Sequence, residues 1–406
     1  MGKAKKQKKW TRLRHKIVTA VVRVFLAPYT RRKYGIKVEK FAGQGKRQYV
    51  VLFNHQTAFD QFFVGMAFKG AVYYVASEDL FSNGFSSKVI KYIVAPIPIR
   101  KQATDPRAVI NIMRVAKEGG TIALAPEGNR TFSGKTEYIN KALIPLLKKL
   151  GLPIALFRIE GGYGVHPRWS DVVRKGEMRA YVSRVVEPEE YKDMTTDELY
   201  ALVEKELYVN EANAENTFTH EKLAEYLERA VYVCPDCGLS TFESRGDLIT
   251  CKKCGKTVRY LPTTKLQGVD CDFPFAFVDE WYNYQCDFIN NLDVNAYNDA
   301  PMYEDTVALT EVIPFENKVL LGEEVQVKLY GNRIEMQIKN GEMQTYSFDK
   351  VSAVTVLGKN KVNVYVDKRI YQMKGDARFN ALRYVNVYYR YKNIQKGDAN
   401  DKFLGL

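Results

Sequence analysis

Residues 49–60 carry the strongest structural and chemical signal of the chain: Tyr49-Val50-Val51-Leu52-Phe53-Asn54-His55-Gln56-Thr57-Ala58-Phe59-Asp60. The first five residues form an apolar run that predicts a buried strand. His55 follows it, so we expect the imidazole at the carboxyl end of a strand, where open α/β sheets bind ligands. Together with Asp60, it has the composition of a general base, because the carboxylate can hold one ring nitrogen while the other takes a proton. The stretch offers no good nucleophile, so we expect the nucleophile to be a substrate group such as a hydroxyl.

The same residues also have a purely structural interpretation. Thr57 and Asp60 match the spacing of a helix cap, with Asp60 reaching back to a backbone amide. His55 alone would then be an ordinary hydrogen-bonded histidine at a strand end. The stretch by itself leaves both interpretations open.

The pattern around it predicts an α/β domain over residues 41–195. Short apolar runs at Tyr73–Ala76, Thr121–Ala125 and Ile154–Phe157 predict further strands. Between them, Asp105-Pro106 is typical of a helix start and Gly119-Gly120 of a helix end. Alternating strands and helices favour a largely parallel sheet.

The net charge is concentrated at the N-terminus. The 406-residue chain has a net charge of +14, and residues 1–40 hold 14 Lys and Arg against one acid, Glu39. Residues 17–27 add an amphipathic pattern in which Ile17, Val21, Val24 and Phe25 share one helical face. The run is too short to span a bilayer, so residues 1–40 are predicted to contact an anionic membrane surface peripherally. A nucleic-acid-binding tail, a signal peptide and a core helix are the alternatives.

Four cysteines form two C-x-x-C-G motifs in residues 231–262. Cys234 and Cys237 are separated by thirteen residues from Cys251 and Cys254. This spacing predicts a zinc ribbon with four thiolate ligands, and a closed four-cysteine set makes the zinc structural. Disulfides are the alternative and would need an oxidising compartment. Cys271 and Cys286 lack such spacing and are predicted to be small buried residues. Mixed charges around the ribbon argue against nucleic-acid binding.

The remaining chain divides into a connector, a linker and a β-rich domain. Residues 196–230 are predicted as a helical connector, with helices near 195–209 and 219–231. Residues 263–303 form an aromatic-rich linker with a helix near Trp281–Asn290, and its aromatic residues are expected to be core. Residues 304–395 show repeated short β runs and then a helical run, Asp376 to Tyr391, which favours a small pleckstrin-homology-like barrel with a structural or lipid-binding role.

Three further blocks follow the His55 block in a fixed order. They are Pro96-Ile97-Pro98-Ile99-Arg100, Ala125-Pro126-Glu127-Gly128-Asn129-Arg130-Thr131 and Gly151-Leu152-Pro153-Ile154-Ala155. The four blocks together resemble the glycerolipid acyltransferase family that includes 1-acylglycerol-3-phosphate acyltransferases. The resemblance covers roughly residues 15–190.

The resemblance implies roles for individual residues. His55 would deprotonate the acceptor hydroxyl and Asp60 would orient the imidazole. Arg100 and Arg130 would bind the acceptor phosphate, with Lys101 as an additional candidate. Glu127 would contact glycerol hydroxyls or hold Arg130, and Gly128 would let the backbone approach closely. A structural ion pair is the alternative for Arg100, Glu127 and Arg130. No residue marks the oxyanion donors.

Two departures from the family pattern affect the acceptor site. Asn129 stands where the family commonly has Thr, and Ala125 where a larger apolar residue is usual. Because Lys101 follows Arg100 directly, the residue that aligns with the family's phosphate-binding Arg can also differ by one position.

The sequence thus predicts a peripheral enzyme on the cytoplasmic face of the membrane, with no spanning helix. It would transfer an acyl group from acyl-CoA or acyl carrier protein to lysophosphatidate, forming phosphatidate. Glycerol-3-phosphate or another lysophospholipid is the alternative acceptor. The alternative of another class is a non-catalytic lipid- or nucleic-acid-binding zinc-ribbon protein.

Overall fold

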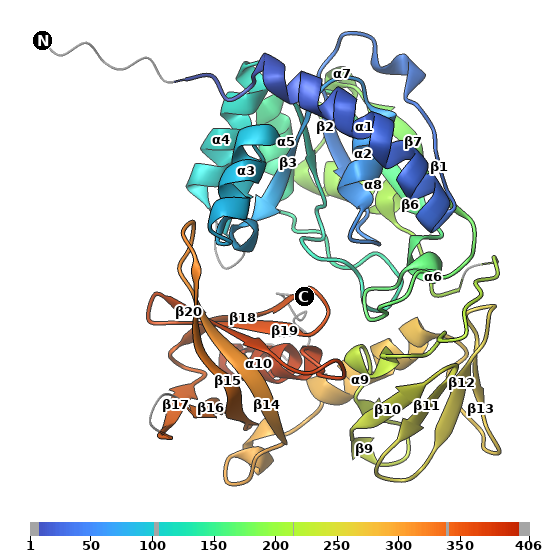
Figure 1. Ribbon diagram of the computed structural model, residues 1–406, viewed down its shortest axis with the longest axis vertical. Coiled ribbons are helices and arrows are strands. Elements are labelled where there is room, and N and C mark those ends of the chain that lie inside the picture. The colour runs from blue at the N-terminus through green and yellow to red at the C-terminus, as the bar shows by residue number, and fades with distance from the viewer. Residues whose placement is uncertain (1–7, 101–104, 214, 338–340, 398–406) are drawn as a thin grey trace, which may run out of the picture.

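A computed structural model describes residues 8–100, 105–213, 215–337 and 341–397. Figure 1 shows an α/β domain at one end and two β-rich parts side by side at the other. One hydrophobic core runs through both β-rich parts and reaches into the α/β domain at Phe132, Tyr163 and Trp169. The predicted zinc ribbon and β-rich domain are therefore packed as one body with each other and with the domain that carries His55.

The α/β domain is built on a seven-stranded sheet. Its strand order is β1 (Ile36–Val38), β7 (Met178–Val186), β6 (Ile154–Glu160), β2 (Val50–Phe53), β5 (Thr121–Leu124), β3 (Val72–Ser77) and β4 (Ile97–Ile99). Every neighbouring pair is parallel except β6 and β7. The predicted α/β class and largely parallel sheet are confirmed. The central strand β2 is buried along its whole length, as its continuous apolar run predicts.

Helices cover the sheet, and three of them end at or just before a glycine. They are α1 (Leu13–Tyr34), α2 (Asp60–Ala67), α3 (Phe85–Ile93), α4 (Pro106–Lys117), α5 (Leu143–Leu150), α6 (Gly162–Val165), α7 (Pro188–Tyr191) and α8 (Thr196–Leu207), with short 3-10 turns η1 (Ala42–Gln44) and η2 (Glu78–Phe81). The Asp105 side chain caps α4 by accepting hydrogen bonds from the amides of Arg107 and Ala108. Gly119 follows α4 with φ of +81°, which glycine adopts without strain.

The helix α1 turns its apolar residues outward. Ile17, Val21 and Val24 are exposed, and Phe25 is 71% exposed. Arg23 points the other way, and its guanidinium donates hydrogen bonds to the carbonyls of Gly65 and Phe68. Across the described part of the chain, no helix is both long and apolar enough to cross a membrane.

The connector after α8 differs from the prediction. Residues 219–231 contain only the short 3-10 turn η3 (Leu227–Arg229), so the predicted second helix is wrong. The amide of Ala224 bonds to the carbonyl of Gly246, and the amide of Tyr226 bonds to the Ser244 hydroxyl. These bonds to the neighbouring hairpin replace the bonds that a helix would make within itself, and Tyr226 takes a φ of +73°.

The cysteine motifs lie on two small sheets. β8 (Val233–Cys234) pairs with β9 (Gly238–Leu239), and β10 (Phe242–Arg245), β11 (Leu248–Cys251), β12 (Thr257–Tyr260) and β13 (Leu266–Gly268) form an antiparallel sheet. The helix α9 (Val278–Asn290) and the turn η4 (Val294–Tyr297) follow. Trp281 and Tyr282 on α9 are buried, so these aromatic residues belong to the core, as expected.

The C-terminal part is a curled antiparallel sheet, where the sequence predicts a small β-barrel. Its order is β17 (Met343–Ser347), β16 (Arg333–Gln337), β15 (Lys318–Leu329), β14 (Tyr303–Val312), β20 (Arg369–Lys374), β19 (Lys361–Val366) and β18 (Val351–Leu357). In the described ranges, β17 and β18 do not pair, so the sheet is a half-barrel. The helix α10 (Leu382–Lys396) begins later than Asp376 and packs where closure would occur: Tyr388 bonds to the carbonyl of Val351, and its ring contacts Phe348.

Candidate active site

His55 and Asp60 are hydrogen-bonded at the carboxyl end of β2. The imidazole Nδ1 lies 2.8 Å from Asp60 Oδ2, and the carboxylate is fully buried while the imidazole is 23% exposed. Because a carboxylate only accepts, Nδ1 carries the proton and Nε2 is the free base. Burial lowers the pKa of His55, and the bond to Asp60 opposes this shift. The imidazole is therefore neutral at physiological pH and can accept a proton.

Asp60 is held by a set of local donors. Its carboxylate also accepts bonds from the amide of Gln56 (2.7 Å), the amide of Thr57 (2.9 Å) and the Thr57 hydroxyl (2.6 Å). Asp60 thus reaches back to a backbone amide, as predicted, but Thr57 is not the helix cap: the N-cap of α2 is Phe59, whose amide donates a 3.1 Å bond to the Thr57 hydroxyl. The structural and the catalytic interpretations both apply to Asp60, because the carboxylate that holds the turn is the one that orients His55.

Glu127 stabilises the backbone at His55. Its Oε1 accepts a 2.7 Å bond from the His55 amide, and its Oε2 accepts a 2.9 Å bond from the Glu137 amide. Burial raises the pKa of Glu127 to about 8, although both amide bonds favour the charged form. Neither Glu127 oxygen forms an ion pair with Arg130 in the described residues, so the predicted Glu127–Arg130 lock is absent there.

Arg130 is a half-buried cation that has no carboxylate partner among the described residues. Within the described residues it forms no ion pair, and its Nη1 lacks a hydrogen-bond partner. Burial lowers its pKa, while Asp60 and Tyr34 nearby oppose that shift. A desolvated guanidinium with a free donor is costly unless an anion completes it, so this position is suited to an anionic ligand.

The other predicted residues contribute less directly. Arg100 lies just beyond β4, where its amide bonds to Asp105 and its side chain is exposed on the wall of the same cavity as His55. Lys101 lies outside the described residues. Gly128 has φ of +72°, and no atom of the described residues would meet a Cβ there, so the backbone turn explains the glycine.

A large cavity joins these groups. Its volume is about 1980 Å³, and its lining includes His55, Arg130 and apolar residues of α1, α2 and α3. Tyr282 and Cys286 of α9, and Leu357 and Tyr389 of the C-terminal part, line it as well. The β-rich half of the chain therefore forms part of the cavity wall.

Arg168 supports the site residue Arg130, and the sequence did not reveal this role. It is buried, and its Nη1 donates a 2.7 Å bond to the carbonyl of Arg130. It follows no recognisable motif, and only the folded chain brings it beside Arg130.

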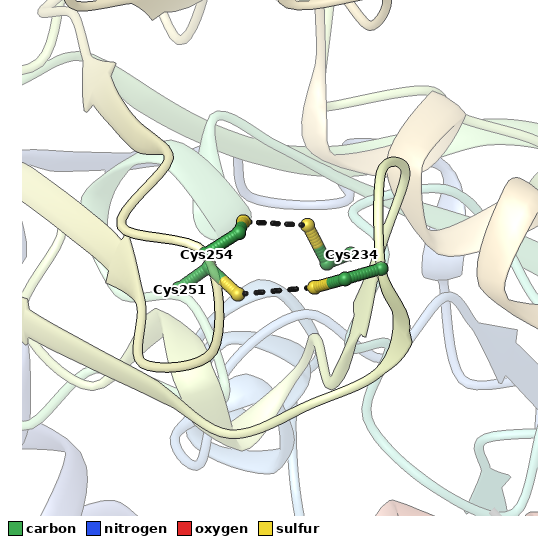
Figure 2. A group of neighbouring side chains, drawn as sticks. Cys234, Cys251 and Cys254 are labelled. Atoms are coloured by element: carbon green, nitrogen blue, oxygen red, sulfur yellow. Dashed lines mark hydrogen bonds between the residues drawn. The ribbon is translucent and has the colours of Figure 1, made fainter.

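The four motif cysteines converge on one point (Figure 2). Their sulfur atoms all lie within 4.8 Å of one another, with 3.7 Å between Cys234 and Cys254 and 3.6 Å between Cys237 and Cys251. Tetrahedral zinc with Zn–S bonds of about 2.3 Å requires sulfur separations of about 3.8 Å. The donor set and spacing fit a zinc ion, and all four thiols are free of disulfides. Cys271 is exposed, contrary to expectation, because it lies in the loop after β13, whereas Cys286 is partly buried.

Comparisons with known proteins agree with the predicted resemblance. The acyltransferase family matches residues 32–159. Among solved structures, a 1-acyl-sn-glycerophosphate (LPA) acyltransferase, PlsC, from Thermotoga maritima is similar at 22% identity and a TM-score of 0.39, over 47% of this chain and 77% of that chain. A TM-score this low supports no conclusion about the chain. A search of curated proteins finds no match. Through residues 32–159, the chain therefore carries a domain of the acyltransferase family.

Proposed function

We propose that this protein transfers a fatty acyl group from acyl-CoA or acyl carrier protein to the hydroxyl of lysophosphatidate, forming phosphatidate. The observation that carries the proposal is the His55–Asp60 pair in an acyltransferase-family domain, since His55 lines the same cavity as the half-buried Arg130, which forms no ion pair within the described residues. The pair suits proton transfer, and Arg130 suits an acceptor that carries a phosphate.

The proposed reaction needs one base and no protein nucleophile. His55 Nε2 takes the proton of the acceptor hydroxyl as its oxygen attacks the thioester carbonyl. The tetrahedral intermediate collapses, the C–S bond breaks, and the imidazolium returns the proton to the thiolate. Asp60 stabilises the imidazolium through the 2.8 Å bond to Nδ1. The oxyanion donors remain unassigned.

Arg130 would bind the acceptor phosphate, with Arg100 at the cavity wall as a second contact. An arginine suits this role because its planar fork makes paired, charge-assisted bonds to phosphate oxygens. Glu127 acts as a brace for His55, since it bonds to the amides of His55 and Glu137.

The proposed location is peripheral, on the cytoplasmic face of the membrane. The exposed apolar face of α1 and the basic residues of 1–40 would contact anionic lipid. The four cysteines would bind a structural zinc ion. The pleckstrin-homology-like character of the half-barrel stays a prediction.

The test is acyl transfer with defined substrates. Long-chain acyl-CoA and acyl carrier protein are each offered with lysophosphatidate, glycerol-3-phosphate and an uncharged monoacylglycerol. We expect turnover with lysophosphatidate, loss of kcat in His55→Ala, and a raised acceptor KM in Arg130→Gln. Turnover with glycerol-3-phosphate and not with lysophosphatidate would identify glycerol-3-phosphate as the acceptor. No turnover by folded, liposome-bound protein with any pair would favour a non-catalytic binding protein, and gel shift against liposome floatation would then identify its partner.

A further inference from the structure

The turn between β18 and β19 reaches from the C-terminal half-barrel to the residues around Arg130. The carbonyl of Gly358 accepts a 2.8 Å bond from Arg168 Nε. The ammonium of Lys359 donates to the carbonyl of Ser170 and, at 2.9 Å, to Asp171 Oδ1. This turn therefore contacts a loop of the α/β domain more than 180 residues earlier in the sequence.

Arg168 links that turn to Arg130. Its Nε bonds to Gly358, its Nη1 bonds to the carbonyl of Arg130, and its guanidinium lies 4.1 Å from the centre of the Phe132 ring. Three contacts on a buried side chain leave it little freedom to move. The position of the Arg130 backbone thus depends on a hydrogen bond to a different part of the fold.

Positive charge collects around this link. Arg130 is close enough to both Arg168 and Lys359 to lower the pKa of each, and Asp171, the one carboxylate bonded to Lys359 in the described residues, is shared with Arg229. Burial is the main cause that lowers the pKa of the nearby His166 to about 3, and Lys359 and Arg130 add to the effect. Asp60 lies near Arg130 and Glu137 near Arg168, but neither carboxylate forms an ion pair with these arginines in the described residues, so a bound anion would stabilise the half-buried guanidinium of Arg130.

We propose that the β18–β19 turn completes the acceptor phosphate site, with Arg168 and Lys359 holding Arg130 in place for the phosphate and adding to its positive field. Arg168 and Lys359 are positioning residues in this assignment. The half-barrel is then part of the acceptor site and not an independent appendage. The assignment rests on the proposed function for the identity of the acceptor, but the anion site itself is separable from it.

The experiment compares two contacts that the half-barrel makes with the α/β domain, in the full chain. Lys359→Gln removes the ion pair to Asp171, and Arg168→Lys keeps the charge but loses the fork that reaches Gly358 and Arg130. Lys318→Gln is the matched control, because it removes the 2.6 Å ion pair to Asp79 at a second contact between the same parts. Melting curves establish that each variant is folded.

Two readouts are taken. The first is KM for lysophosphatidate and, separately, for acyl-CoA. The second is the dissociation constant of inorganic phosphate, from the rise in Tm with phosphate at constant ionic strength. We expect Lys359→Gln and Arg168→Lys to raise the acceptor KM and the phosphate dissociation constant about tenfold, the effect of one charge-assisted hydrogen bond. KM for acyl-CoA and the Lys318→Gln values should stay within about twofold of wild type.

The outcomes separate the two proposals. If wild type turns over and folded Lys359→Gln binds acceptor and phosphate like wild type, this inference is overturned and the function stands. The inference is equally overturned if Lys318→Gln matches Lys359→Gln, or if phosphate does not raise the Tm of wild type. If wild type shows no turnover but phosphate binding weakens as expected, the proposed function fails and the anion site stands. Should Arg168→Lys fail to fold, Lys359→Gln alone decides.

Discussion

Replacing Asp60 by Asn should slow acyl transfer about a thousandfold. The amide oxygen can take the place of Oδ2 and still accept bonds from the Gln56 amide, the Thr57 amide and His55 Nδ1, so the tautomer survives. The amide nitrogen replaces Oδ1, where it can donate to the Thr57 hydroxyl but no longer accepts the 3.0 Å bond from the Thr57 amide. What is lost is the negative charge opposite the imidazolium. Two unit charges about 4 Å apart interact by about 4 kcal/mol at an effective dielectric constant of about 20, which corresponds to about a thousandfold in kcat.

Thr57→Val is the matched control for this prediction. It removes the 2.6 Å hydroxyl bond to Asp60 and keeps the charge and nearly the same shape. Loss of one hydrogen bond to a charged group lowers the stability of the fold by about 1.5–3 kcal/mol. Because the charge opposite the imidazolium remains, kcat should fall about tenfold at most.

The assay is the pH dependence of kcat and kcat/KM for both variants. Asp60 raises the pKa of His55 against the larger effect of burial, so the acid limb of kcat/KM should move to lower pH in Asp60→Asn. A folded Asp60→Asn variant with kcat within tenfold of wild type would refute the view that Asp60 stabilises the imidazolium.

Three other perturbations have defined outcomes. The pKa of Glu127 in the folded protein, about 8, lies above its value in the unfolded chain, so the contribution of Glu127 to stability is full below about pH 4.5 and is lost as pH rises through 8. Glu127→Gln should remove this part of the fall in Tm between pH 5 and 9. A Tm–pH profile that is unchanged in the variant would contradict the raised pKa of Glu127. Elemental analysis should find one zinc per chain, and its removal by a chelator, or Cys251→Ser, should lower Tm by about 5 °C or more because the ribbon shares its core with the half-barrel. Phe25→Asp on α1 should weaken sedimentation with anionic vesicles at least about tenfold, since burying a phenylalanine contributes about 1.5–3 kcal/mol; equal sedimentation of the two proteins would argue against this face.

Local features of the fold and the site were predictable from the sequence. His55 and Asp60 lie five residues apart across a strand end, so their contact follows from the β2–α2 turn alone. The start of α4 at Pro106 and the metal-like grouping of the cysteines are also set by neighbours in the chain. The first two features follow from short-range geometry, whereas the cysteine motifs are joined across 14 to 20 residues and were predictable because two C-x-x-C-G turns together make one four-thiolate set.

Features that depend on distant contacts could not be predicted. The spacing of Leu223, Leu227 and Val231 suits a helix, but backbone bonds to Gly246 and Ser244 determine the actual conformation. Arg168 acquires its place only because Gly358, 190 residues later, lies beside it. The sheet likewise stays an open half-barrel because α10 packs between its edges, which the strand pattern does not indicate.

The helix α1 is at once a wall of the cavity and an exposed apolar surface. Val22 and Leu26 line the cavity, while Val24 and Phe25 face outward from the same turns. A sixteen-carbon chain that left a bilayer through water would lose about 0.8 kcal/mol per methylene, or about 12 kcal/mol in all. With α1 seated on lipid, a lysolipid passing beside one helix would never meet that barrier. Its encounter with His55 would then be set by its density in the membrane plane, and the bulk concentration of substrate would be the wrong variable for describing the enzyme's rate.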